Sequence, residues 1–139
     1  MPADSGLDVR KNLNDIRNAI DSFHKGGIEV SLFIEPDTEM IDLAKECGAD
    51  YIEISTAAYS NAADESEVSK EIGRIYKASE HAADIRIKIN AGQGLNYRNV
   101  VPLLHARELL ELNIGKAIIT RSGSVGLSEA VQEMMRILD

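Results

Sequence analysis

The chain has 139 residues, with 23 Asp and Glu residues against 15 Lys and Arg residues, and a formal net charge of −8 at pH 7. Apolar residues make up 44% of it without forming a run of about 18, so the sequence predicts one soluble domain over residues 1–139 and excludes a membrane-spanning segment. The acidic balance, with only four Tyr, two Phe and no Trp, argues against nucleic acid as a partner, because such binding needs a basic field and stacking side chains.

The start of the chain and its few cysteine and histidine residues indicate its cellular location and whether it binds a metal. Residues 1–6 lack the basic and apolar regions of a secretory signal, so we expect a cytoplasmic location. The single cysteine, Cys47, cannot form an internal disulfide and is interpreted as a small buried helix residue. His24, His81 and His105 have no second ligand at metal-binding spacing. We expect neither a metal nor a cofactor.

Hydrophobic periodicity predicts about five helices that alternate with four strands. The predicted helices cover residues 7–25, 38–47, 64–82, 99–104 and a last segment from about 124, and the predicted strands cover residues 28–34, 51–55, 85–90 and 112–120. Asp37 or Thr38 can cap the second helix and Gly48 can end it. The fourth strand is centred on residues 117–119, where Ala is followed by two Ile residues. Each connection between strands is long enough for a helical crossover, which predicts a parallel sheet.

Polar residues on one face of the strands distinguish two architectures. Glu53 alternates with isoleucines in the second strand, and Lys88 and Asn90 do so in the third. A doubly wound sheet is covered on both faces and its strands are apolar throughout, whereas a barrel turns one face inward, where charged residues can serve a site. Four strands cannot close an eight-stranded barrel. The sequence therefore predicts an α/β fold of parallel βα repeats, half of a TIM (β/α)8 barrel.

Glu53 and Lys88 lie on the inward face of neighbouring predicted strands, where they could form an ion pair. One interpretation is a carboxylate that orients or polarises a substrate inside the barrel, with Lys88 as a lumen residue. The other is a solvated pair in a sheet left open, which has little energetic weight. The pair alone specifies no reaction.

Two loops at strand ends are candidate phosphate sites. Gly92 and Gly94 follow the third strand and permit close approach of a ligand to the backbone, although a plain tight turn has the same sequence. Gly115 and Lys116 are placed at the start of the fourth strand. At its end, just before the last helix, backbone N–H groups with Arg121, Ser122 and Ser124 could hold an anion, although an ordinary helix cap with an exposed arginine is the alternative.

Five segments carry a family resemblance: Ser5-Gly-Leu-Asp-Val, Ile28-Glu-Val-Ser-Leu-Phe-Ile, Tyr51-Ile-Glu-Ile-Ser-Thr, Ile87-Lys-Ile-Asn-Ala-Gly-Gln-Gly-Leu and Leu112-Asn-Ile-Gly-Lys-Ala-Ile-Ile. In order and spacing they resemble the carboxyl-terminal half of the pyridoxine 5′-phosphate synthase family, whose complete form is a (β/α)8 barrel. The resemblance implies a transferase of vitamin B6 biosynthesis that condenses 3-amino-2-oxopropyl phosphate with 1-deoxy-D-xylulose 5-phosphate.

The resemblance also implies roles for individual residues. Glu53 matches the glutamate of the family's Ile-Glu-Ile-His-Thr-Gly strand, thought to stabilise the transition state, and Gly94 and Gly115 match glycines that contact the aminoketone phosphate. Gln93 stands where the family has its proton-donating histidine, and a glutamine cannot transfer a proton near neutral pH. Lys116 replaces the histidine of the family's Gly-His pair, so it keeps a cation with a different geometry.

The family's first four strands supply its proton-accepting histidine and glutamate, and this sequence does not contain them. We therefore expect the chain alone to be catalytically inactive. Two functions stay open: an enzyme half that acts when joined to an amino-terminal half, and an inactive half-barrel that binds phosphorylated ligands or serves in assembly. Unpaired strand edges favour association, so the expected partners are a second copy of the chain or a separate amino-terminal half-barrel, besides phosphorylated small molecules.

Overall fold

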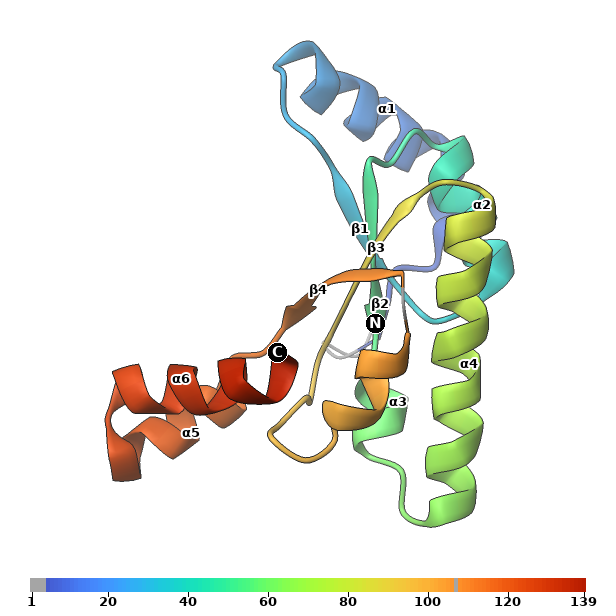
Figure 1. The fold of residues 1–139 in the computed structure, drawn as a ribbon. Coiled ribbons are helices and arrows are strands. Elements are labelled where there is room, and N and C mark those ends of the chain that lie inside the picture. The colour runs from blue at the N-terminus through green and yellow to red at the C-terminus, as the bar shows by residue number, and fades with distance from the viewer. Residues whose placement is uncertain (1–4, 107) are drawn as a thin grey trace.

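The computed structural model describes residues 5–106 and 108–139 and contains one four-stranded sheet (Figure 1). The strands are β1 (Ser31–Ile34), β2 (Tyr51–Ser55), β3 (Lys88–Gly92) and β4 (Leu109–Asn113), in that order across the sheet and with every neighbouring pair parallel. The helices are η1 (Val9–Asn12), α1 (Leu13–Lys25), α2 (Thr38–Glu46), α3 (Ala57–Ser60), α4 (Glu65–Asp84), η2 (Val101–His105), α5 (Lys116–Val125) and α6 (Leu127–Leu138), where η marks a 3-10 helix. The predicted parallel α/β half-barrel is confirmed.

Local signals position the first three βα units close to their predicted limits. The Asp37 side chain caps α2 by accepting hydrogen bonds from the backbone N–H groups of Glu39 and Met40, at 2.9 and 3.2 Å. Gly48 follows α2 with φ +93°, a conformation that favours glycine. Asp64 caps α4 in the same way through the N–H of Glu67 at 2.9 Å.

The fourth strand was predicted at the wrong place. The segment 117–119 lies in α5, where the N–H of Ile119 donates to the Gly115 carbonyl at 3.1 Å. The strand that pairs with β3 comes earlier, and its Leu112 lies opposite Ala91. Preference of an isoleucine run for β structure is a weak signal that tertiary context overrides. The structure also contains α3, which the sequence did not predict, and a 3-10 helix at the predicted 99–104 helix.

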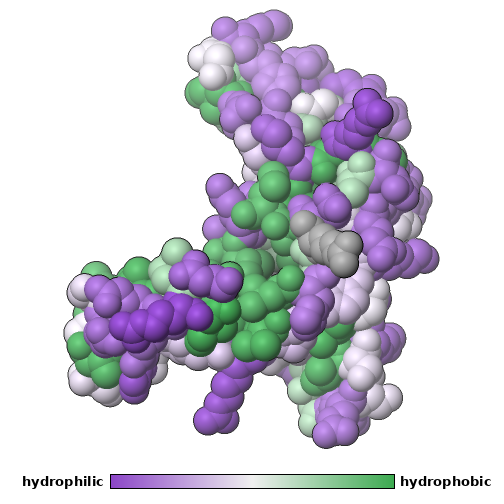
Figure 2. Space-filling view, viewed as in Figure 1, coloured by the Kyte–Doolittle hydropathy of each residue, from purple (hydrophilic) through white to green (hydrophobic). Residues whose placement is uncertain are grey.

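The two faces of the sheet differ as the alternation of polar residues predicts. Helices α2 and α4 lie along one face of the sheet (Figure 1). The strand side chains of Ile34, Ile52 and Ile54 are fully buried in the hydrophobic core. The opposite face opens into a hollow, which the space-filling view shows with apolar and polar side chains side by side (Figure 2). Glu53 and Lys88 belong to this open face, which corresponds to the barrel interior.

Helices α5 and α6 pack against each other as a hairpin that projects from the end of β4 (Figure 1). Several of their large apolar side chains are exposed: Ile119 by 64%, Leu127 by 57% and Met135 by 51%. Within the described ranges, the helices contain no segment that is long and apolar enough to cross a membrane.

Candidate ligand-binding cleft

A cleft of about 700 Å³ opens where β3 and β4 end, between the loop after β3 and the first turns of α5. Its lining residues come from α3, from the loop after β3 and from the β4 to α5 region: Ser60, Asn61, Gln93, Gly94, Leu95, Asn96, Tyr97, Asn113, Gly115, Lys116, Ala117, Thr120 and Arg121. The carboxyl ends of parallel strands are where (β/α)8 barrels place their active sites. The size of the cleft suits a small molecule.

The loop after β3 turns sharply at two consecutive residues. Gln93 and Gly94 both have positive φ, at +87° and +76°. A Cβ added to Gly94 would lie 2.6 Å from the Cβ of Ser60, so only glycine fits this position without displacement of its neighbour. Sequence reasoning left open whether Gly94 belongs to a plain turn, and the structure shows that the turn brings its backbone against α3 and into the cleft wall.

The buried hydroxyl of Thr56 stabilises this loop by hydrogen bonding to its backbone carbonyls. Its Oγ1 lies 2.6 Å from the carbonyl oxygens of both Gly92 and Gln93, and its backbone N–H donates to the Gly92 carbonyl at 2.8 Å. Ser60 adds a hydrogen bond from its Oγ to the Gln93 carbonyl at 3.2 Å. Thr56 immediately precedes α3 and Ser60 is its last residue. This short helix, which hydrophobic periodicity did not predict, therefore supports the loop after β3. The short run of mainly small residues in α3 has no hydrophobic periodicity from which the helix could be predicted.

The other wall of the cleft begins at Gly115 and Lys116, which start α5 rather than the fourth strand. The earlier prediction was wrong because the strand ends at Asn113 and the chain turns into the helix within two residues. The first N–H groups of a helix have no carbonyl partner within it and carry its positive dipole end. Lys116 is exposed at this end of α5. The amide side chain of Asn113, which the sequence analysis did not single out, also lies in the lining.

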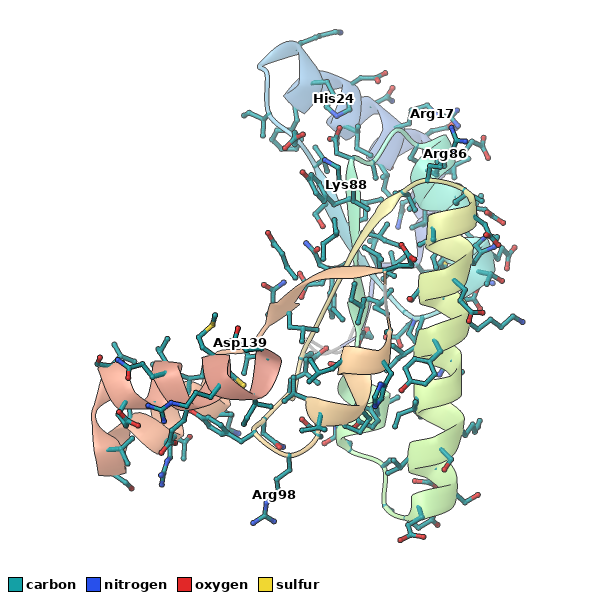
Figure 3. All side chains as sticks on the ribbon, viewed as in Figure 1. Arg17, His24, Arg86, Lys88, Arg98 and Asp139 are labelled. Carbon is teal, nitrogen blue, oxygen red and sulfur yellow. The ribbon has the colours of Figure 1, made fainter. Side chains whose placement is uncertain are left out.

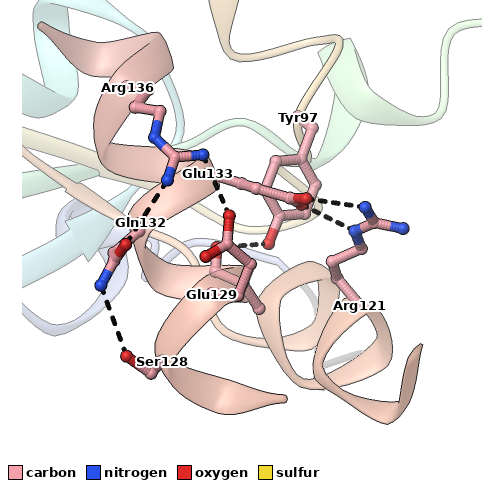
Figure 4. A network of polar contacts seen from close by, with 8 residues as sticks. Tyr97, Arg121, Ser128, Glu129, Gln132, Glu133 and Arg136 are labelled. Atoms are coloured by element: carbon pink, nitrogen blue, oxygen red, sulfur yellow. Dashed lines mark hydrogen bonds and ion pairs between the residues drawn. The ribbon is translucent and has the colours of Figure 1, made fainter. Parts of the chain in front are cut away.

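Arg121 and Ser122 occupy the body of α5, not the start of the last helix as predicted. The guanidinium of Arg121 donates two hydrogen bonds of 2.7 Å to the carboxylate of Glu133 in α6 (Figure 4). This contact raises the pKa of Arg121 and lowers the pKa of Glu133. Ser122 donates from Oγ to the carbonyl of Ile119. Arg121 reaches the cleft lining, but its charge already has a partner, and neither Ser122 nor Ser124 lines the cleft.

Tyr97 connects the two walls. Its ring lines the cleft and its hydroxyl donates to the Ala130 carbonyl in α6 at 2.8 Å, next to the contact between Arg121 and Glu133 (Figure 4). The Tyr97 hydrogen bond joins the loop after β3 to α6, and the contact between Arg121 and Glu133 joins α6 to α5. The sequence could not indicate this, because each partner lies in a different element.

Glu53 and Lys88 do not form the predicted ion pair. Tyr51, not Glu53, lies opposite Lys88 in the sheet, and the Lys88 ammonium donates to the Tyr51 hydroxyl at 2.9 Å while lying 4.5 Å from the centre of its ring. The hydrogen bond to Tyr51 raises the pKa of Lys88, which points into the hollow (Figure 3). Glu53 lies one row nearer the cleft. Its Oε1 lies against the backbone of Gly92, where it would collide with the Cβ of any other residue at position 92.

Gln93 turns its side chain toward β2, where its Oε1 accepts a hydrogen bond from Ser55 at 3.2 Å. The Ser55 hydroxyl in turn accepts from the N–H of Ala57 at 3.3 Å. A glutamine amide does not ionise near neutral pH, so it cannot act as a general acid or base. At the end of β3 this site therefore offers hydrogen bonds instead of proton transfer.

Parallel strands backed by helices on one face, with the cleft at their carboxyl ends, define the chain as half of a (β/α)8 barrel. The family model described as "Pyridoxal phosphate biosynthesis protein PdxJ" matches residues 1–139. The chain therefore belongs to the PdxJ family of pyridoxal phosphate biosynthesis proteins, and the resemblance found in the sequence is confirmed.

Curated relatives give the same family and show how much of it the chain represents. The chain is 44% identical over 138 residues to a pyridoxine 5′-phosphate synthase of Pseudoalteromonas translucida, covering 99% of this chain and 57% of the relative. It is 41% identical to that of Pelodictyon phaeoclathratiforme and 43% identical to that of Legionella pneumophila, again over 99% of this chain and over 58% and 56% of the relatives. The chain thus spans little more than half the length of these relatives.

A solved structure supports the fold alone. The crystal structure of the Amycolatopsis orientalis BexX/CysO complex matches with a TM-score of 0.63 at 18% sequence identity, over 98% of this chain and 52% of that chain. A match over about half of another chain agrees with the half-barrel architecture.

Proposed function

We propose that the chain acts in pyridoxine 5′-phosphate biosynthesis by binding a phosphorylated small molecule in the cleft between the loop after β3 and α5. One observation carries this proposal. Among the described residues that line the cleft, the charged ones are Lys116 and Arg121, and because Glu133 pairs with Arg121, Lys116 is the cation that carries the proposal in a chain of net charge −8. A cationic cleft in an acidic protein favours an anionic ligand at that place.

The phosphate is expected at the start of α5. Lys116 contributes an exposed ammonium, and the first N–H groups of the helix add donors and the positive end of its dipole. Arg121 is expected to stabilise the cleft wall, because two of its N–H donors already bind the Glu133 carboxylate, which neutralises its charge. The acidic remainder of the chain opposes anions at long range, but screening over about 8 Å at physiological salt leaves the local donors in control.

The reacting part of the ligand would then lie between the phosphate and Glu53. In this arrangement the Glu53 carboxylate can stabilise developing positive charge, and Gln93 can orient a carbonyl or hydroxyl group by hydrogen bonding. In the complete enzyme the proposed reaction is condensation of 3-amino-2-oxopropyl phosphate with 1-deoxy-D-xylulose 5-phosphate. Ring closure needs several proton transfers, and the described residues that line the cleft include no histidine for them. The chain alone is expected to bind without turnover.

The second candidate is a non-catalytic half-barrel that binds phosphorylated ligands or serves in assembly. The hydrogen bond between Ser55 and Gln93 favours it, because it places two side chains that do not titrate near neutral pH at the end of the strands. Activity measured after mixing with an amino-terminal half of a relative separates the two candidates. Formation of pyridoxine 5′-phosphate supports the enzyme half, and its absence in a stable complex supports the binding module.

Calorimetric titration with inorganic phosphate tests the binding site itself. Replacing Lys116 with Ala should weaken binding about fivefold, the size of about 1 kcal/mol for a partly solvated ionic contact. The matched control is Lys45→Ala, which removes an exposed lysine from α2, outside the cleft. Equal affinities of the Lys116→Ala and Lys45→Ala variants would show that phosphate does not bind at α5.

A further inference from the structure

Gln93 has a backbone conformation that its residue type disfavours. Among the described residues, the non-glycine ones with positive φ are Arg86, at +59°, and Gln93, at +87°. Arg86 follows the end of α4, a place where helices often end in the left-handed conformation. Gln93 ends no helix; it follows β3 and lines the cleft. A non-glycine residue at positive φ is strained and persists only where the surrounding structure enforces it, so Gln93 needs a neighbour that fixes its backbone.

The hydroxyl of Thr56, a fully buried residue, is that neighbour. Its Oγ1 lies 2.6 Å from the carbonyl oxygens of both Gly92 and Gln93. These oxygens belong to the two peptide groups on either side of the Gln93 Cα. The φ and ψ angles of Gln93 describe how those two planar groups are rotated about this Cα. One hydroxyl in contact with both groups therefore fixes both angles.

A threonine hydroxyl has a single proton, and the Gln93 carbonyl needs it most. The Gly92 carbonyl already accepts a hydrogen bond from the backbone N–H of Thr56 at 2.8 Å. The other described donor to the Gln93 carbonyl is the Ser60 hydroxyl, at the longer distance of 3.2 Å. Loss of the Thr56 hydroxyl would therefore weaken the contacts that hold Gln93 at positive φ.

The same contacts determine what the loop after β3 presents to the cleft. In a trans peptide the N–H points away from the C=O, so with both carbonyls turned to Thr56 the N–H groups of Gln93 and Gly94 point away from it. Gln93 and Gly94 line the cleft, and Thr56 is not among the described residues that do so. We propose that Thr56 is a positioning residue of the cleft, whose hydroxyl holds Gln93 at positive φ and so sets how this loop meets a ligand. Its role toward a ligand rests on the proposed function, whereas the geometry of the loop is a property of the free chain.

Nuclear Overhauser effects (NOEs) in the isotopically labelled 139-residue chain test this geometry without a ligand. A positive φ brings the amide and α protons of a residue close together, so we expect a strong NOE between them at Gln93. Thr56→Ser keeps the hydroxyl and should keep this NOE, whereas Thr56→Val keeps the side-chain shape without the hydroxyl and should weaken it. The same NOE at Arg86, which has positive φ outside the cleft, should stay strong and reports that each variant is folded. An undiminished Gln93 NOE in Thr56→Val would overturn the proposal.

Ser60→Ala tests the same point if Thr56→Val, at a buried position, prevents folding. It removes the weaker donor to the Gln93 carbonyl from a half-buried position. Because the Thr56 hydroxyl remains, the Gln93 NOE should stay strong. Its loss in Ser60→Ala would assign the positioning to Ser60 and overturn the role of Thr56.

Calorimetric titration with dihydroxyacetone phosphate connects the loop to the ligand. Thr56→Val should weaken binding about three- to tenfold, the effect of roughly one lost hydrogen bond, whereas Thr56→Ser should match the wild type within about twofold. Wild-type affinity in a Thr56→Val chain that has lost the Gln93 NOE would overturn the role toward the ligand. If the wild-type chain does not bind the phosphate ester while the NOEs behave as expected, the proposed function fails and the positioning of the loop by Thr56 stands.

Discussion

Replacement of Gly94 by Ala tests how tightly the cleft's loop is packed. Gly94 has φ +76°, and the added Cβ would lie 2.6 Å from Cβ and 2.8 Å from Oγ of Ser60. A non-glycine residue in the left-handed region costs about 1–2 kcal/mol, and overpacking a close contact costs about 1–3 kcal/mol more. We therefore expect Gly94→Ala to lower the free energy of unfolding by about 2–5 kcal/mol.

A matched glycine separates the two costs. Gly27 has nearly the same φ, +73°, but a Cβ built there meets nothing within 4 Å. Gly27→Ala should therefore lose only about 1–2 kcal/mol in urea unfolding. Adding Ser60→Gly to the Gly94→Ala variant should recover the steric part of its loss, measured against Ser60→Gly alone. Equal destabilisation by Gly94→Ala and Gly27→Ala would refute the close packing of the loop against α3.

The remaining predictions concern a helix cap, an ion pair, association and catalysis. Asp37→Ala should lower the free energy of unfolding by about 1 kcal/mol, because two N–H groups of α2 lose their acceptor. Arg121 lowers the pKa of Glu133 below its usual value, so this contact stabilises the fold above the ordinary glutamate pKa, and the stabilisation is lost as the pH falls through the lowered pKa. Glu133→Gln should remove this acid-dependent part of the change in melting temperature. We expect the 139-residue chain to sediment as a dimer or larger assembly at micromolar concentration, and Leu110→Lys, at a 60% exposed position on the edge strand β4, to shift it toward the monomer; a monodisperse wild-type monomer would contradict this. The purified chain should form no pyridoxine 5′-phosphate from the two family substrates, and if an amino-terminal half restores activity, Gln93→His should raise the rate.

Features with short-range causes were predictable from the sequence. The β2 strand was predicted at its observed limits, Tyr51–Ser55, because it lies between a helix-ending Gly48 and a loop of small residues. Asp37 was a candidate cap because the pattern of a short polar residue before an apolar helix face is local. The polar face of the sheet was predictable from strict alternation, since a strand has a period of two.

Features that depend on contacts between distant elements were not predictable. The segment 117–119 has the composition of a strand, yet β3 pairs with the preceding residues and leaves it to α5. Arg121 was predicted to bind an anionic ligand, but in the structure it binds Glu133, which lies twelve residues away on another helix. It therefore stabilises the wall of the cleft. Lys88 pairs with Tyr51 instead of Glu53 because the register, which the sequence does not reveal, places Tyr51 beside it.

Amide shift mapping with a triose phosphate is the most direct test of the central claim, that the cleft between the loop after β3 and α5 binds a phosphorylated small molecule. The labelled 139-residue chain is titrated at physiological salt and each backbone amide is followed. We predict saturable shifts at Gly94, at Gly115 and at Lys116, with amides on the far side of α4 unmoved. Shifts confined to residues outside the cleft, or none at millimolar ligand, would contradict the claim.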